Sequence, residues 1–375
     1  MPLLKKLTRF RRDLHKIPEV SRDLPKTKKY ILSVLKNLDC EIIEVMESGV
    51  CAYFDRGQPA TTAYRADMDA LPVTEKNTHS FISRHPGKMH ACGHDGHMSM
   101  GLAMAEYVDS HKELPCNVLL IFQPAEETTG GAREICETGI LQRYNVDRIF
   151  STHMWPFAPA GSISSRPGRM MPRSSQINIG ITGRTSHATA PENGIDALYI
   201  GCRYVQEIYD RKAREGKPDP APDERTIIQV CKFESGTARN IISGYTELVG
   251  TLRAFSDEDF QWLISILKGA ASDLEAEFGC RIEVKYTEGY PPIVNDIELY
   301  DSVAPSLRAS LDNFIEMPEP AMISEDYSFY GLEVPSIFFY VGTGTGIALH
   351  SADFDFDESV LVQGVELYKT LLWER

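Results

Sequence analysis

Two short apolar runs, each followed or ended by polar residues, constrain the fold of this chain more than any other feature. They are NVLLIFQ, residues 117–123, and RIFSTHMWP, residues 148–156, and helix-patterned segments lie before and between them. A strand that is apolar along its whole length is buried on both faces, as in parallel sheets covered by helices. The alternation of such strands with helices therefore predicts an α/β fold with a mostly parallel sheet flanked by helices.

A second pattern begins near residue 174. The segment SQINIGITG, residues 175–183, alternates polar and apolar side chains, as expected for a strand with one buried face. Helices are then expected at 196–212 and 257–279, and strands at 226–234, 246–255 and 281–289. This order predicts a second, two-layer α+β domain, with the Pro-rich segment KPDPAPDE as a loop inside it.

The length of the chain also favours two domains. Its 375 residues exceed the roughly 250–300 residues at which a single hydrophobic core usually stops growing. We therefore expect a catalytic domain in two parts, residues 1–174 and 289–375, interrupted by an inserted domain at 175–288.

The charge and hydropathy of the chain narrow its partners and its location. A formal net charge of −14 disfavours nucleic-acid and anionic-membrane partners, because both attract basic surfaces. The N-terminal segment lacks the continuous apolar region of a signal peptide, and no stretch reaches the roughly 18–20 apolar residues of a transmembrane helix. A cytoplasmic protein that acts on a small molecule is the expectation.

The eight cysteines show no CxxC spacing. In a reducing cytosol free cysteines are usually buried as small hydrophobic side chains, and we expect this of all except Cys92. Cys92 lies in the motif HACGHDGHM, residues 90–98, which also contains three histidines and an aspartate. Taken alone, this cysteine could be a nucleophile, half of a disulfide or a metal ligand.

The spacing within this motif allows a metal site. Cys92 and His94 can reach one ion from a tight turn, since Gly93 between them permits the necessary backbone conformation. A thiolate combined with imidazoles favours zinc first, with manganese, cobalt and nickel as alternatives. His90 and His97 are expected only to support the loop.

Chemically reactive side chains follow several of the predicted strands. They are Asp67, Asp69, Glu126, Glu127, His153 and, after the Gly-rich VGTGTGIAL, His350. Open parallel sheets place their ligand sites beyond the carboxyl ends of their strands, so these residues are expected to share one cleft. Glu126 and Glu127 are adjacent, and neighbouring side chains of an extended segment point in opposite directions. One can therefore bind metal while the other faces the substrate as a base.

Ten segments of the chain resemble a known family. They are RRDLHKIPEVS, YRADMDALPV, HACGHDGHM, FQPAEE, THMWP, GRTSHA, ARNIIS, GTLRAF, SEDYSFY and ALHSADF, in the family's order from residue 11 to residue 354. The family is that of metal-dependent N-acyl-amino-acid amidohydrolases, which includes aminoacylases, hippurate hydrolases, auxin-conjugate hydrolases and N-acetyldiaminopimelate deacetylases. It is related to the dinuclear-zinc exopeptidases, whose domain arrangement the predicted order of elements resembles. The resemblance implies that the inserted domain at 175–288 is a lid or dimerisation domain.

The resemblance implies a site for two divalent metal ions, Zn²⁺ or Mn²⁺ with Co²⁺ and Ni²⁺ as alternatives. The implied ligands are Cys92, His94, Glu127, His153 and His350. Cys92 stands where related peptidases use a bridging aspartate. Asp67 stands where those exopeptidases place a histidine ligand, so His94 is expected to take that role.

The resemblance also implies roles around the metal ions. Glu126 resembles the general base. Asp69 resembles the acid that orients a metal ligand without binding the metal itself. His187, from the inserted domain, resembles the donor that stabilises the tetrahedral oxyanion, acting across a dimer or after domain closure. Asn240 and Arg253 resemble the residues that hold the substrate carboxylate. Glu325 also matches the family, and it is expected to support the metal ligands without binding the metal itself.

The predicted function is therefore the metal-dependent removal of an acyl group from an N-acyl amino acid, by a homodimer or larger homo-oligomer. The alternatives are an N-acetyldiaminopimelate deacetylase, a metallo-dipeptidase or carboxypeptidase, a cysteine hydrolase using Cys92, and a non-catalytic binding homologue. Three arginines depart from the family pattern, and one of them is a candidate for contact with a second anionic group on the substrate. They are Arg166, Arg169 and Arg173.

Overall fold

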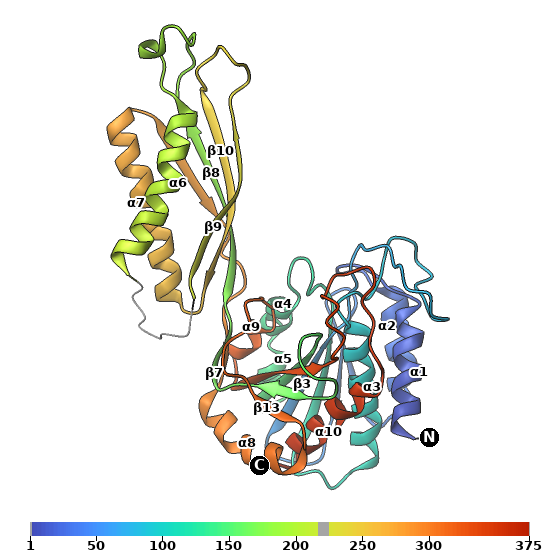
Figure 1. Ribbon diagram of the computed structural model, residues 1–375. Helices are drawn as coiled ribbons and strands as arrows, with labels where there is room; N and C mark the ends of the chain where they lie inside the picture. Colours follow the sequence, from blue (N-terminus) through green and yellow to red (C-terminus); the bar gives the residue numbers. More distant parts are fainter. Residues whose placement is uncertain (1, 217–224, 375) are drawn as a thin grey trace. The chain divides into compact units, whose positions relative to one another are not determined.

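The computed structural model describes residues 2–216 and 225–374, and the chain divides into two compact units (Figure 1). The first unit contains Met1–Met170, Val294–Pro318 and Glu325–Arg375, and the second contains Met171–Ile293 and Glu319–Ser324. The Pro-rich segment at 217–224, which we expected to form a loop, lies outside the described residues.

An eight-stranded sheet forms the centre of the first unit, in the order β1-β2-β4-β3-β5-β14-β6-β13. The four central strands, β4, β3, β5 and β14, run parallel to one another. Strands β2 and β1 on one side and β6 on the other join by antiparallel pairs, and the edge strand β13 pairs with β6 in parallel. The strands are β1 (Glu41–Val45), β2 (Gly49–Phe54), β3 (Thr61–Asp67), β4 (Asn117–Gln123), β5 (Val146–Trp155), β6 (Ile163–Ser165), β13 (Phe314–Glu316) and β14 (Ser336–Gly342). Every residue of β3, β4 and β14 is buried, and the central residues of β4 and β14 are accordingly apolar without alternation.

Helices cover this sheet. They are α1 (Leu3–His15), α2 (Pro25–Leu35), α3 (His94–Ser110), α4 (Ala132–Glu137), α5 (Ile140–Arg143), α8 (Ile297–Ser310), α9 (Ser328–Gly331) and α10 (Val360–Trp373). Helix α3 packs against β3, β4 and β5 and against α1 and α10; Figure 1 shows it beside α1. Its residues are buried nearly all round its first three turns, because it lies between the sheet and other helices.

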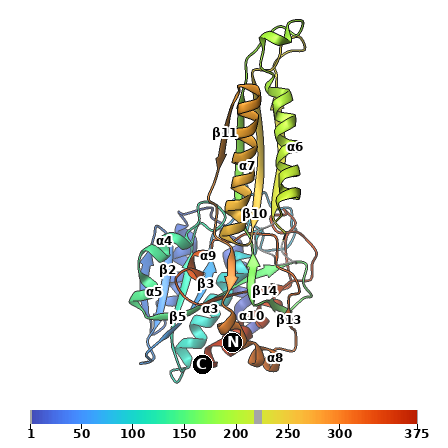
Figure 2. The ribbon, with the colours of Figure 1, turned by 90° about the vertical axis from the view of Figure 1, so that its left-hand side faces the viewer.

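The second unit is a two-layer α+β structure. Its four-stranded antiparallel sheet has the order β11-β8-β10-β9, and α6 and α7 lie side by side against one face of it (Figures 1 and 2). The elements are β8 (Arg173–Thr182), α6 (Ala197–Glu215), β9 (Ile227–Ser235), β10 (Tyr245–Ala254), α7 (Asp257–Phe278) and β11 (Arg281–Tyr286). The predicted fold class, a mostly parallel α/β sheet with a separate two-layer α+β domain, is confirmed.

The expectation for the cysteines is wrong at several positions. Cys202 and Cys231 are exposed, and Cys40 and Cys280 are half-buried. Cys231 lies on β9, an edge strand whose residues are mostly exposed. The position of a cysteine relative to the core therefore decides its burial, and the residue type alone does not.

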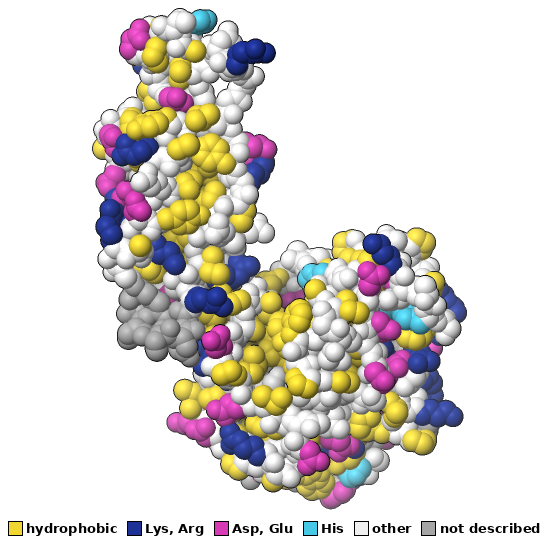
Figure 3. Space-filling view, in the orientation of Figure 1, with side chains coloured by type: hydrophobic (Ala, Val, Ile, Leu, Met, Phe, Trp, Pro, Cys, Tyr) yellow, Lys and Arg dark blue, Asp and Glu magenta, His cyan; other side chains and the backbone are white. Residues whose placement is uncertain are grey.

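The described helices are each too short or too polar to cross a bilayer. On the face shown in Figure 3, acidic and basic side chains are interspersed over both units.

Candidate metal centre

Three neighbouring parallel strands bring the predicted acids and imidazoles of the first unit together. In the sheet β3 lies between β4 and β5. Asp67 ends β3, Glu126 and Glu127 follow the end of β4, and His153 lies near the end of β5. The carboxyl ends of parallel strands meet at one edge of a sheet, so these side chains converge as predicted from the sequence.

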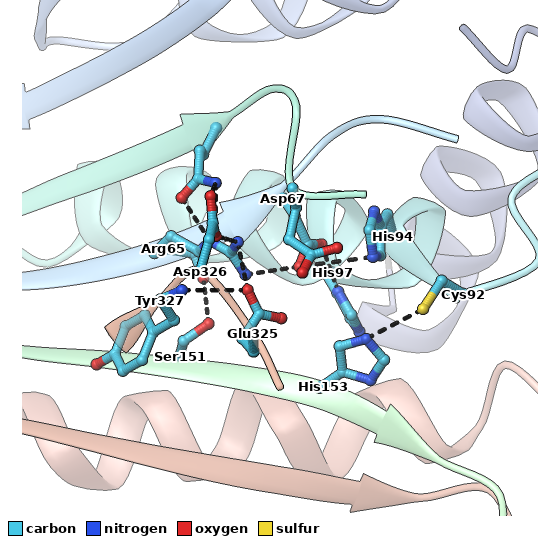
Figure 4. A network of polar contacts seen from close by, with 12 residues as sticks. Arg65, Asp67, Cys92, His94, His97, Ser151, His153, Glu325, Asp326 and Tyr327 are labelled. Atoms are coloured by element: carbon cyan, nitrogen blue, oxygen red, sulfur yellow. Dashed lines mark hydrogen bonds and ion pairs between the residues drawn. The ribbon is translucent and has the colours of Figure 1, made fainter. Parts of the chain in front are cut away.

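Cys92 and His94 reach the same place from the turn that precedes α3. Gly93 between them adopts a φ of 87°, and an added Cβ there would lie 2.8 Å from Cγ of Met154. This position therefore requires glycine for both its backbone conformation and its close packing. The turn directs the thiol of Cys92 to within 3.3 Å of Nε2 of His153 (Figure 4).

The five predicted ligands fall into overlapping groups whose donor atoms lie within 4.8 Å of one another. One group contains Cys92, His94 and His153, and another contains Cys92, Glu127 and His350. Cys92 is common to both groups, as expected for a thiolate shared between two ions. The Nε2 atom of His350 lies 3.3 Å from Oε1 of Glu127, and Nε2 of His94 lies 3.8 Å from the same oxygen.

Backbone carbonyls fix the orientation of two of the imidazoles. The Nδ1 atom of His94 lies 2.7 Å from the carbonyl oxygen of Asp69, and Nδ1 of His153 lies 2.8 Å from that of Met154. Because a carbonyl only accepts, both Nδ1 atoms donate, and each Nε2 carries the free lone pair that a metal requires. Among the described residues, Nε2 of His94 and Oε1 of Glu127 are buried without a hydrogen-bond partner. These orphaned buried atoms fit a bound cation.

The pKa values of this region reflect deep burial. Burial lowers the pKa of His153 to about 3, and burial also lowers that of His94. Both imidazoles are therefore neutral, which is the form that binds metal. Burial and the negative charges of Glu127 and Glu126 hold the pKa of the Cys92 thiol well above its usual value. The thiolate accordingly needs a nearby cation to form.

Asp69 positions the two glutamates. Its carboxylate oxygens accept the backbone N–H groups of Glu126 at 3.0 Å and of Glu127 at 3.2 Å. The residue before them, Ala125, has a φ of 67°, which is uncommon for a side chain other than glycine. Burial and the negative charges of Glu325 and Glu127 raise the pKa of Glu126 well above its usual value. Asp69 thus supports the base and one ligand through their backbone, while its own carbonyl orients His94.

A buried charge network lies directly behind the predicted ligands (Figure 4). The guanidinium of Arg65 donates to Asp67 at 2.6 Å and to Glu325 and Asp326 at 2.8 Å each. Its Nε donates to Gln123 at 2.9 Å. We did not single out Arg65, Gln123 or Asp326 from the sequence, although the segment YRAD at the end of β3 places two charges in a strand that is otherwise uncharged.

Asp67 and His97 connect this network to the predicted ligands. Nδ1 of His97 lies 2.6 Å from Oδ1 of Asp67, and the backbone N–H of Met154 donates to Nε2 of His97 at 2.9 Å. Both nitrogens of His97 are therefore occupied, in keeping with the supporting role we expected for it. The other oxygen of Asp67 lies 3.7 Å from Nε2 of His94.

Three predicted substrate or catalytic residues lie in the second unit. His187 and Asn240 are close to each other, since the backbone N–H of Ala188 donates to the carbonyl of Asn240 at 3.0 Å. Both side chains are exposed. His187 follows the end of β8 and Asn240 precedes the start of β10, at the end of the sheet where the N–H of Gly183 donates to the carbonyl of Gly244.

Arg253 lies at the opposite end of β10. Its partner in the register of the sheet is Ser174, whereas the other end of β10 pairs Tyr245 with Thr182. At about 3.3 Å per residue, Arg253 is roughly 30 Å from the turn that contains Asn240. Within one chain, Asn240 and Arg253 therefore cannot contact the same small carboxylate.

Arg173 is already engaged within the second unit. Its guanidinium donates to Asp257 at 2.6 Å and to the carbonyl of Glu288 at 2.8 Å, and it lies 4.7 Å from the centre of the Phe260 ring. These contacts weaken its candidacy for substrate contact. That role stays a hypothesis for Arg166 and Arg169.

Comparison with known proteins gives a consistent assignment. The chain is 32% identical to an N-acetyldiaminopimelate deacetylase of Shouchella clausii over 362 residues, with 96% of each chain covered. It is 33% identical to an uncharacterized hydrolase of Staphylococcus epidermidis, covering 98% of this chain and 97% of the relative. Its fold superimposes on that of a dinuclear metal-binding M20 peptidase of Bacillus subtilis with a TM-score of 0.86, at 28% identity, covering 99% of this chain and 98% of that one.

The family model extends through most of both units. The pattern of peptidase family M20/M25/M40 matches residues 63–374, a range that includes every predicted ligand, the base Glu126 and the exposed pair His187 and Asn240. The chain is a hydrolase that belongs to peptidase family M20/M25/M40.

Proposed function

We propose that this chain is a cytoplasmic, metal-dependent amidase that removes the acyl group from an N-acyl amino acid. The observation that carries the proposal is the convergence of five potential ligands on two groups that share Cys92. A base candidate, Glu126, lies beside them. The amidase activity implied by the named relative at 32% identity supports the same reaction class.

The five ligands would be Cys92, His94, Glu127, His153 and His350, of which Cys92 belongs to both groups. When bound, two divalent cations polarise an amide carbonyl and acidify a water molecule. Glu126 would take the proton from that water and return it to the leaving nitrogen. Because Asp69 accepts the backbone N–H of Glu126, the start of the Glu126 side chain is held in place. The carboxylate could then reach both the water molecule and the leaving nitrogen.

The substrate contacts that we propose come from the second unit. His187 would donate to the developing oxyanion, and Arg253 would bind the carboxylate of the amino acid, for which its forked guanidinium is suited. Asn240 would contribute the amide donor that completes carboxylate binding. Because Asn240 and Arg253 lie at opposite ends of β10, one substrate can meet both only if two copies of the chain contribute. A homodimer is therefore part of the proposal.

Subunit complementation tests the role of the dimer. Glu126→Gln and His187→Ala should each inactivate the enzyme, whereas heterodimers of the two should regain activity. In such a heterodimer one site combines an intact Glu126 from one copy with an intact His187 from the other. Hydrolysis is measured after co-expression with two affinity tags. Pairing Glu126→Gln with Cys92→Ser is the matched control, because neither site is then complete; equal activity of the two heterodimers would contradict the proposal.

Metal removal tests the reaction class. Chelation should abolish hydrolysis, and added Zn²⁺, Mn²⁺ or Co²⁺ should restore it, while bound metal should protect Cys92 from thiol alkylation. Activity that survives complete metal removal would indicate a cysteine hydrolase. A protein that carries its full complement of metal but hydrolyses neither N-acyl amino acids nor dipeptides would indicate a binding homologue.

A substrate screen decides the finer assignment. The panel contains N-acetyl, N-benzoyl and longer N-acyl amino acids, N-acetyldiaminopimelate and dipeptides. The S. clausii relative favours N-acetyldiaminopimelate as the second candidate substrate. A comparison of dicarboxylic with neutral substrates in Arg166→Ala and Arg169→Ala variants also tests whether either arginine binds a second anionic group.

A further inference from the structure

A second cluster of potential ligands lies in the first unit, separate from the candidate metal centre. It consists of His15, Glu75 and His79, whose nearest donor atoms lie within 4.8 Å of one another. Nε2 of His15 is 3.0 Å from Oε1 of Glu75, and Nε2 of His79 is 3.4 Å from the same oxygen. Ligand atoms around a tetrahedral zinc ion lie about 3.3 Å apart, so these separations match such a site.

The surroundings of the cluster resemble those of established metal sites. Nδ1 of His15 lies 2.8 Å from Oδ2 of Asp95, and a metal-bound histidine commonly donates its other ring nitrogen to a carboxylate in this way. Neither ring nitrogen of His79 has a hydrogen-bond partner, although both atoms are buried. Oδ2 of Asp355 lies 3.8 Å from Nε2 of His79, within reach of a fourth ligand position.

The formal charge of the cluster favours a dication. Four carboxylates, from Glu75, Asp95, Asp355 and Glu358, face the two guanidiniums of Arg11 and Arg12, which pair with three of them. With neutral imidazoles the cluster carries a formal charge of −2, which a single divalent ion would cancel.

The pKa of His15, at the centre of this cluster, reflects the excess of negative charge around it. Burial opposes its protonation, but the hydrogen bonds to Asp95 and Glu75 outweigh burial and raise the pKa of His15 to about 9. An ion bound here would displace this proton.

The position of the cluster gives such an ion a structural purpose. Residues 68–93, between β3 and α3, form no helix or strand in the described chain, and Glu75 and His79 lie in this segment. His15 ends α1, which packs against α3. A metal that joins the segment to α1 would restrain a long irregular connection, whose ordering otherwise costs conformational entropy. His79 keeps 17% of its side chain exposed, which leaves an entry path for the ion.

We propose that His15, Glu75 and His79, with Asp355 as the fourth ligand, bind one divalent ion of the zinc class at a structural site distinct from the candidate metal centre. The ion fastens the segment 68–93 to the end of α1. Its donor set is nitrogen and oxygen only, whereas the candidate metal centre contains the sulfur of Cys92. This difference makes the two sites separable by spectroscopy.

The experiment compares metal content in the full chain loaded with Co²⁺ and freed of excess ion. We expect His79→Gln to hold one equivalent of cobalt fewer than the parent, as measured by elemental analysis. The near-ultraviolet absorption from the bond between the Cys92 thiolate and cobalt should persist unchanged, because the new site has no thiolate. The matched control is His85→Gln, a histidine of the same segment that contacts the carbonyl of Pro18 and lies outside the cluster; its cobalt content should equal that of the parent.

A second variant keeps the test decisive if His79→Gln folds poorly. Glu75→Gln preserves the size of the side chain and should lose the same single equivalent of cobalt. Equal cobalt content in the parent and in both variants would overturn the proposal. So would a loss of cobalt that removes the thiolate absorption in parallel, because the missing ion would then belong to the candidate metal centre.

Discussion

Replacing Glu126 with glutamine should lower kcat by about 10²- to 10⁴-fold, the range over which a positioned general base contributes. The amide matches the carboxylate in shape but cannot accept a proton from water. The Glu126 side chain is buried, and its backbone N–H is held by Asp69 at 3.0 Å, so the substitution should leave the geometry of the site intact. Metal content is therefore expected to stay near that of the parent.

The measurements are steady-state hydrolysis of the best substrate from the screen and elemental analysis of the purified variant. Glu113→Gln is the matched control, since Glu113 is an exposed glutamate of the same unit and its replacement should leave both quantities unchanged. A Glu126→Gln enzyme with full metal and nearly full kcat would remove Glu126 from the role of base. Loss of metal along with activity would instead make it a ligand.

Replacing Arg65 with methionine should destabilise the first unit by about 3–5 kcal/mol, the usual cost of breaking a buried ion pair by removing one partner. Arg65 is fully buried, and its guanidinium contacts the carboxylates of Asp67, Glu325 and Asp326. Without it, these three carboxylates would remain buried with no guanidinium between them. Arg65→Lys should recover only part of the loss, because an ammonium cannot reproduce the forked geometry.

Urea denaturation followed by tryptophan fluorescence measures this effect, since Trp155 and Trp373 both lie in the first unit. The control is Arg133→Met, which breaks an exposed pair with Glu137 and should cost no more than about 0.5 kcal/mol. Adding Glu325→Gln to Arg65→Met should restore part of the lost stability by removing one uncompensated charge. Equal stability losses for Arg65→Met and Arg133→Met would contradict this account of the network.

The fold class followed from local patterns because the two kinds of strand differ in sequence. The five central residues of NVLLIFQ are all apolar because β4 is covered on both faces, whereas SQINIGITG alternates because β8 has one buried face. The order of strands in the sheet was not predictable in this way. Strand β14 inserts between β5 and β6, although it comes from residues 336–342, and pairing over such sequence distances leaves no local periodicity.

The residues of the candidate site likewise divide into those that local sequence patterns predict and those that depend on contacts between distant parts of the chain. Ligands at strand ends, such as Glu127 and His153, could be predicted because parallel strands share an edge. Arg65 and Asp326 were missed because each has an ordinary sequence context, and their importance comes from a contact between residues 261 positions apart. The resemblance to a family suggested roles for Asn240 and Arg253, but the distance between them became evident only when the register of β10 was known.

The length of β10 has a consequence of its own for the proposed enzyme. The length of the strand pair β8 and β10 sets the distance between Asn240, near one end of the pair, and Arg253 at the other end. Inserting two residues into each strand would increase this distance by about 7 Å while keeping the same side chains buried, because the strand period is two. A one-residue insertion would turn the apolar face outward. Relatives whose dimers hold their two sites farther apart or closer together can therefore be expected to differ here by even numbers of residues in both strands.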